Sequence, residues 1–164
     1  MVAAEKYLKL VKDRLTDDGA TTSEANVGGF SAVVGYRAQF RLRWLATRVH
    51  LFTVVASVPY VNSQRLQQFT NDVLDFGVKE RGRFRGLQTG VGVIAALVSE
   101  SVEAEARMWA TTDLVDRRGA FAWPALVDLS SGRISFHVGA VTRGGLYASW
   151  MRQQIETALP VPPD

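Results

Sequence analysis

Arginine side chains carry the clearest chemical pattern in this sequence. The segment from Tyr36 to Val55 contains four arginines and one histidine but no acidic residue. A guanidinium group presents a planar fork of donors that suits phosphate and carboxylate groups better than a lysine ammonium does. These arginines therefore predict contact with an anionic ligand, a partner protein or water, because no acid within the segment can neutralise them.

The spacing of the arginines divides them into two groups. Arg37, Arg41 and Arg43 alternate with apolar residues, a period of two that is typical of a strand with one polar face. Arg48 and His50 break this alternation, and one continuous strand would be unusually long. We therefore expect a reversal or bulge near Leu45–Arg48, and we predict that Arg37, Arg41 and Arg43 share one binding surface.

A second basic segment, "KERGRFRG", predicts a loop from Lys79 to Gly86 that contains Arg81, Arg83 and Arg85. Neutralisation of the phosphate backbone is the main term in nucleic-acid affinity, so these residues suit a nucleic-acid surface. Such a surface also needs aromatic groups beside its cations for base stacking. In the expected strand, Tyr36 and Phe40 point away from the arginines, which counts against nucleic acid there.

Other motifs predict no catalytic or cofactor site. The chain has no cysteine, which excludes thiolate chemistry and zinc sites that need sulfur. Its two histidines, His50 and His137, belong to no HxH or HExxH motif. A glycine pattern from Gly90 to Ala95 matches a relaxed dinucleotide fingerprint, but its β-branched surroundings favour a strand. We therefore expect no catalytic residue, no cofactor and no metal.

Composition predicts one soluble, cytoplasmic domain spanning residues 1–164. The chain is 47% hydrophobic, enough to fill a single core. Its net charge is only +3, but residues 25–98 hold nine lysines and arginines against three acids. We find no secretory leader and no apolar run of the ~20 residues that a membrane helix needs.

Hydrophobic periodicity predicts ten elements in the order α-β-β-β-α-β-α-β-β-α. We expect a helix over 2–16, a loop over 17–29, strands from Phe30, a helix from Asn62 or Ser63 that stops near Gly77, and a strand through Gly90. A short helix after Ser101, a hairpin around Ser130–Gly132, a helix over 145–159 and an extended tail over 160–164 complete the chain.

This order predicts an α+β fold. We expect a mainly antiparallel sheet of about five or six strands, with helices packed on one face and at its ends. In topology it resembles the secretion-chaperone-like α/β sandwiches, a resemblance that implies a fold and no function. The first six elements also follow the order of metal-dependent nucleases. Those enzymes need carboxylates on the second and third strands, and this chain has none between Glu24 and Asp72.

Three functions fit these observations. We expect a non-catalytic protein-interaction or chaperone-like module that self-associates as a homodimer, because arginine is enriched at protein interfaces. Its acidic counterparts would be Asp72 and Asp75 or the helix near Glu103. The first alternative is a nucleic-acid-binding protein that uses Arg37, Arg41 and Arg43 together with Arg81, Arg83 and Arg85. The second is an enzyme or small-ligand binder with no recognisable motif.

Overall fold

A computed structural model describes residues 2–81, 89–141 and 145–163 of the chain. The helices are α1 (Val2–Asp17), α2 (Ser63–Arg81), α3 (Ala104–Thr112) and α4 (Gly145–Ala158). The strands are β1 (Thr21–Val27), β2 (Phe30–Arg41), β3 (Thr47–Ser57), β4 (Thr89–Ser99), β5 (Val115–Arg117), β6 (Ala120–Asp128) and β7 (Arg133–Phe136). A short 3-10 helix, η1 (Leu42–Trp44), joins β2 to β3.

The seven strands form one mixed sheet in the order β1-β2-β3-β4-β6-β5, with β7 paired to β6 beside β5. The outer strand pairs are antiparallel, but β3, β4 and β6 run parallel to one another. The expectation of a mainly antiparallel sheet is therefore wrong. The reason is that, along the chain, α2 connects β3 to β4 and α3 lies between β4 and β6. A helix is the usual crossover between parallel neighbours.

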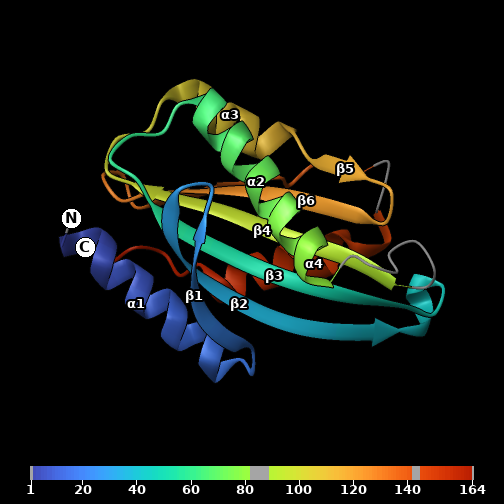
Figure 1. Cartoon of the computed structure of the whole chain (residues 1–164). Coiled ribbons are helices and arrows are strands. Elements are labelled where there is room, and N and C mark those ends of the chain that lie inside the picture. The colour runs from blue at the N-terminus through green and yellow to red at the C-terminus, as the bar shows by residue number, and fades with distance from the viewer. Residues whose placement is uncertain (1, 82–88, 142–144, 164) are drawn as a thin grey trace.

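Helices cover both faces of the sheet (Figure 1). α1 and α4 pack on one face, around a core that includes Tyr7, Leu51 and Trp150. α2 and α3 pack on the other face, around Phe69, Val93 and Ala106. The predicted arrangement, with helices on one face and at the ends, is corrected to three layers. A strand buried from both sides reads as a continuous apolar run, and β4 is such a strand.

The segment predicted as a loop over 17–29 contains the edge strand β1. Its residues, "TTSEANV", are mostly polar and mostly exposed on both faces, so they show no alternation of apolar and polar side chains. Polar and charged residues are common on edge strands, where they discourage pairing with other chains. The strand pairs with β2 along its whole length, from Thr21 opposite Tyr36 to Val27 opposite Phe30.

Several predicted turns and helices are confirmed. β2 and β3 form an antiparallel hairpin whose turn lies between Arg41 and Thr47, which confirms the reversal predicted near Leu45–Arg48. β6 and β7 form the predicted second hairpin, with Gly132 at a φ of +65° in its turn. The last helix begins at Gly145 as expected. None of the described helices is long and apolar enough to cross a membrane.

Two glycines serve close packing. α2 runs past Gly77 to Arg81, so the predicted helix end is wrong. A Cβ on Gly77 would lie 2.7 Å from Val93 Cγ1, which shows that the residue lets α2 approach β4. Gly92 lies within β4 as interpreted from the sequence, and a Cβ there would lie 2.8 Å from Phe121 Cζ.

Candidate functional site

The three arginines predicted to share one surface lie in three different environments. Arg37 forms an ion pair with Asp18 and also donates to the Asp18 backbone oxygen. The Arg41 guanidinium lies 5.1 Å from the centre of the Trp44 ring. Arg43 is exposed on η1, beyond the end of β2. The strand ends at Arg41, so the alternation that grouped these residues does not continue to Arg43.

The acid beside Arg37 was not among those expected from the sequence. Asp72 accepts a hydrogen bond from Gln68, and Asp75 pairs with Arg117. Asp18 follows α1 directly and lies just before β1, whose pairing with β2 brings it near Arg37. Because a loop is expected around Asp18 from the sequence, no strand register predicted its position beside Arg37.

The hairpin assembles a different group of side chains on the opposite face of β2 and β3. Its register places Phe40 opposite Arg48, and Ala38 opposite His50. Phe40 is 49% exposed and Arg48 is exposed, because α2 ends near this part of the sheet. We call this surface the open face and define it by its five main residues: Tyr36, Phe40, Arg48, His50 and Arg81.

Aromatic and basic groups stack on one another within the open face. The Tyr36 hydroxyl and His50 Nδ1 lie 2.8 Å apart in a hydrogen bond. Their rings are nearly parallel, with centres 6.0 Å apart. The Arg81 guanidinium lies 5.0 Å from the centre of the Tyr36 ring, and Phe52 supports that ring from the buried side at 5.1 Å. Arg81 is thereby held against the sheet rather than extended into solvent.

Two arginines of the open face act on His50. Burial lowers the pKa of His50 below the 6.5 of an unperturbed histidine, and the neighbouring Arg81 and Arg48 lower it further. No aspartate or glutamate occurs in β2, η1 or β3. At neutral pH His50 is therefore uncharged, and the two arginines beside it stand where a bound anion would be favoured.

The turn between β2 and β3, which we call the hairpin tip (residues 42–46), exposes two leucines. Leu42 and Leu45 are 80% and 79% exposed. Leu45 and Ala46 both have positive φ angles, 56° and 57°, which are uncommon for residues other than glycine. Backbone strain of this kind concentrates at functional sites, so the conformation supports a role for the tip.

The predicted loop residues contribute to this end of the molecule only in part. Lys79 and Arg81 belong to the last turn of α2. Arg83 and Arg85 lie outside the described residues. Phe84, which lies between these two arginines in the sequence, is also outside that part, and Phe40 is an exposed aromatic residue near Arg48 within it. The period-two pattern named Phe40 as apolar, but only the hairpin register places it beside Arg48.

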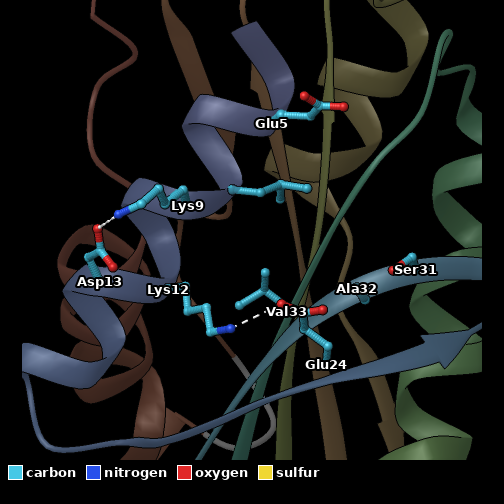
Figure 2. Close-up of a pocket in the computed structure, with 9 residues that line it drawn as sticks. Glu5, Lys9, Lys12, Asp13, Glu24, Ser31, Ala32 and Val33 are labelled. Carbon is cyan, nitrogen blue, oxygen red and sulfur yellow. Dashed lines mark hydrogen bonds and ion pairs between the residues drawn. The ribbon is translucent and has the colours of Figure 1, made fainter. Parts of the chain in front are cut away.

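A groove of about 440 Å³ between α1 and the β1–β2 pair is a second candidate site (Figure 2). Leu8 and Val33 contribute apolar surface to it. Its two lysines are paired with carboxylates: Lys9 Nζ lies 2.8 Å from Asp13, and Lys12 Nζ lies 3.0 Å from Glu24. Because these charges neutralise one another, the groove attracts an anion less than the open face does.

His137 and Asp128, which belong to the second hairpin region, form no hydrogen bond with each other in the described part of the chain. Asp128 is buried and accepts hydrogen bonds from Ser130 and Arg107 rather than from His137. Burial alone would raise the pKa of Asp128, but these bonds and one from Ser131 outweigh it and hold the pKa at about 2. His137 packs edge-on against Trp123, with ring centres 5.7 Å apart. Neither residue forms part of an open polar site.

The nuclease element order is present, from α1 through β1, β2, β3 and α2 to β4. Within the described ranges, no three acidic or histidine side chains are grouped so that they would hold a metal ion. No protein-family model matches the chain, and no curated protein matches it either. The function is therefore argued from the surfaces of this molecule.

Proposed function

We propose that this protein binds single-stranded nucleic acid on the open face. The observation that carries the proposal is the register of the β2–β3 hairpin, which sets the half-exposed ring of Phe40 beside the exposed Arg48. On the sequence alone, the arginines and the aromatic residues were expected on opposite faces. Arg48 of the hairpin and Arg81 of α2 both lie on the aromatic face, which removes that objection.

The two kinds of side chain suit the two parts of a nucleotide strand. An exposed aromatic ring stacks on bases whatever their identity, and arginines follow the phosphate backbone. A sheet surface with exposed aromatic rings is a common platform for unpaired bases. Arg48 and Arg81 supply the phosphate contacts, Phe40 supplies the exposed ring, and Tyr36 orients Arg81.

Fluorescence anisotropy with a labelled single-stranded oligonucleotide tests the proposal. We expect saturable binding at low salt. We expect Arg48→Ala combined with Arg81→Ala to weaken it by about two orders of magnitude, because each lost charge-assisted bond is worth about 1.5 kcal/mol. Arg133→Ala is the matched control, because Arg133 is an exposed arginine on β7, outside the β2–β3 hairpin. Equal affinity of the double variant and the control would overturn the proposal.

The second candidate function is the protein-interaction module expected from the sequence. The exposed leucines of the hairpin tip favour it, because apolar groups surrounded by arginines are typical of protein interfaces. A symmetric dimer through this tip would bring Arg43 and Arg48 of two copies together, which opposes self-association there.

Light scattering after gel filtration tests this candidate. A dimer that Leu42→Ala with Leu45→Ala converts to an 18 kDa monomer would support self-association through the tip. A monomer at high protein concentration would exclude it.

A further inference from the structure

The exposed leucines of the hairpin tip have no part in binding phosphate. Leu42 and Leu45 are among the most exposed large apolar side chains in the described part of the chain. They directly follow the open face in sequence, since Phe40 and Leu42 are separated by one residue. Arg41 and Arg43 lie on either side of Leu42. One short turn therefore joins exposed apolar groups to cationic ones.

The tip is anchored to the core. Trp44 is fully buried and packs against Tyr147 and Trp150, with ring centres 5.2 and 4.9 Å away. Its Nε1 donates to the backbone oxygen of Leu146 at 3.0 Å. The backbone of Ala46 donates to the oxygen of Leu42 and closes the turn. The buried Trp44 therefore holds the turn in place, so that Leu42 and Leu45 can pack against another surface.

The position of the tip relates it to a strand lying on the open face. The turn after β2 extends past the end of α2 at the right of Figure 1, so its outer side is not covered by that helix. A single strand that stacks on Phe40 and continues in the direction of β2 reaches the tip next. The nucleotides that follow the single strand at that point would contact Leu42 and Leu45.

We propose that the hairpin tip recognises the junction between single-stranded and double-stranded nucleic acid. Leu42 and Leu45 press against the last base pair of the duplex, while the unpaired strand follows the open face. Leucine is among the apolar residues that proteins insert at base steps, where they partly unstack the bases. Arg43, which is exposed beside Leu42, contacts a phosphate of the duplex end. This inference rests on the proposed function and narrows its substrate to a junction.

Forked oligonucleotides test the inference, with 2-aminopurine placed in the last base pair. We expect the wild-type protein to bind the fork about tenfold more tightly than the single strand and to raise the 2-aminopurine fluorescence as that base unstacks. Leu42→Ala with Leu45→Ala is expected to abolish both the preference and the fluorescence rise, with single-strand affinity held within about twofold. Met108→Ala, a change at an exposed apolar residue on α3, is the matched control.

The outcomes separate the two proposals. Binding of the single strand with no preference for the fork overturns the junction inference and leaves the proposed function standing. No binding to either oligonucleotide overturns both. If the leucine variant changes the mass of the protein in solution but not its fork affinity, the tip is a protein contact and the inference fails. Circular dichroism and a second variant, Leu42→Gln with Leu45→Gln, separate loss of folding from loss of the apolar contact.

Discussion

Arginine side chains lie at both ends of the sheet, but they are paired with a buried acid at one end and lie beside a histidine at the other. At the β6–β7 turn, Asp128 receives hydrogen bonds from Arg107, from the Ser130 hydroxyl and from backbone N–H groups of the turn. At the β2–β3 hairpin, Arg48 and Arg81 surround His50, and neither strand carries an acid. At the first end the polar groups are buried and bonded to one another. At the second end the basic groups lie near an exposed ring and have the same charge.

This difference explains why a buried acid with a shifted pKa is not the functional candidate. Shifted pKa values arise at structural ion pairs as well as at functional sites. The pKa of Asp128 follows from bonds that complete a turn, so the residue has little capacity left for a ligand. Within the described residues Arg48 and Arg81 form no ion pair, and they lie on the same face as the exposed ring of Phe40. The contrast predicts that changes at one end alter stability and changes at the other alter binding.

Replacement of Asp128 by alanine is expected to have the largest effect. It removes the acceptor for the turn and leaves the guanidinium of Arg107 without its acid, which is expected to lower the free energy of unfolding by about 3 kcal/mol. Urea denaturation measures this loss. Asp116→Ala, on the exposed strand β5, is expected to change stability by less than about 0.5 kcal/mol. Loss of oligonucleotide binding in a folded Asp128 variant would contradict the prediction that changes at this end alter only stability.

Replacement of Phe40 by alanine tests the opposite end. Base stacking on an aromatic side chain contributes about 1–3 kcal/mol per base, so we expect the oligonucleotide affinity to fall by at least about fivefold. Half of the Phe40 side chain is already exposed, and stability is expected to change little. Anisotropy titrations measure the affinity, with Val138→Ala as the exposed apolar control. An unchanged affinity would show that bases do not stack on Phe40.

The strained turn makes a prediction of intermediate size. Glycine adopts a positive φ without steric cost, so Ala46→Gly is expected to stabilise the protein by about 1 kcal/mol. The matched control is Ala38→Gly within β2, where glycine is expected to destabilise the strand by about 0.5–1 kcal/mol. Thermal unfolding compares the two variants. If both destabilise the protein equally, the tip holds no strain that glycine relieves.

The smallest predicted effect is a dependence of binding on pH. The pKa of His50 in the free protein is lowered by burial and by Arg81 and Arg48, whereas a bound phosphate would raise it. Binding therefore takes up a proton, and affinity should increase as the pH falls from the bound pKa toward the lower free value. Titrations between pH 5 and 8 should show this increase in the wild-type protein (the range follows from the ordinary histidine pKa of about 6.5). The increase should be absent in His50→Gln, and an equal increase in both proteins would assign it to another group.

The same shift has a defined effect on stability. The unfolded chain takes up a proton on His50 at a higher pH than the folded protein does, because the folded pKa is lowered. The stability contributed by neutral His50 is therefore present above pH 6.5 and lost as the pH falls toward the folded pKa. Asp128 acts in a lower range, since its stabilisation is present above the ordinary carboxyl pKa and is lost as the pH approaches about 2.

Local patterns predicted much of the fold. The alternation that fails after Trp44 located the β2–β3 reversal, and Gly132 located the second hairpin. The parallel centre of the sheet was missed, because a strand such as β4 shows the same apolar run whichever way its neighbours point. The edge strand β1 was missed because its polar residues lack any period. These features depend on pairing between distant segments, which single-sequence patterns do not contain.

The candidate site was predicted only in part. Sequence spacing identified the basic hairpin and grouped Arg37 with Arg41, but it did not place Asp18 beside Arg37 or Trp44 beneath Arg41. Arg48 was set aside because it broke the alternation. That break indicated the facing strand, since a residue that departs from one strand's alternation after a reversal belongs to the next strand.

The dependence of binding on salt tests the central claim most directly. Each phosphate contact with a single strand contributes about 0.7 to the slope of log affinity against log salt concentration. Loss of Arg48 and Arg81 should therefore reduce the magnitude of that slope by about 1.4 relative to the wild-type protein and the Arg133→Ala control. Slopes measured by anisotropy that are the same in all three proteins would contradict phosphate binding on the open face.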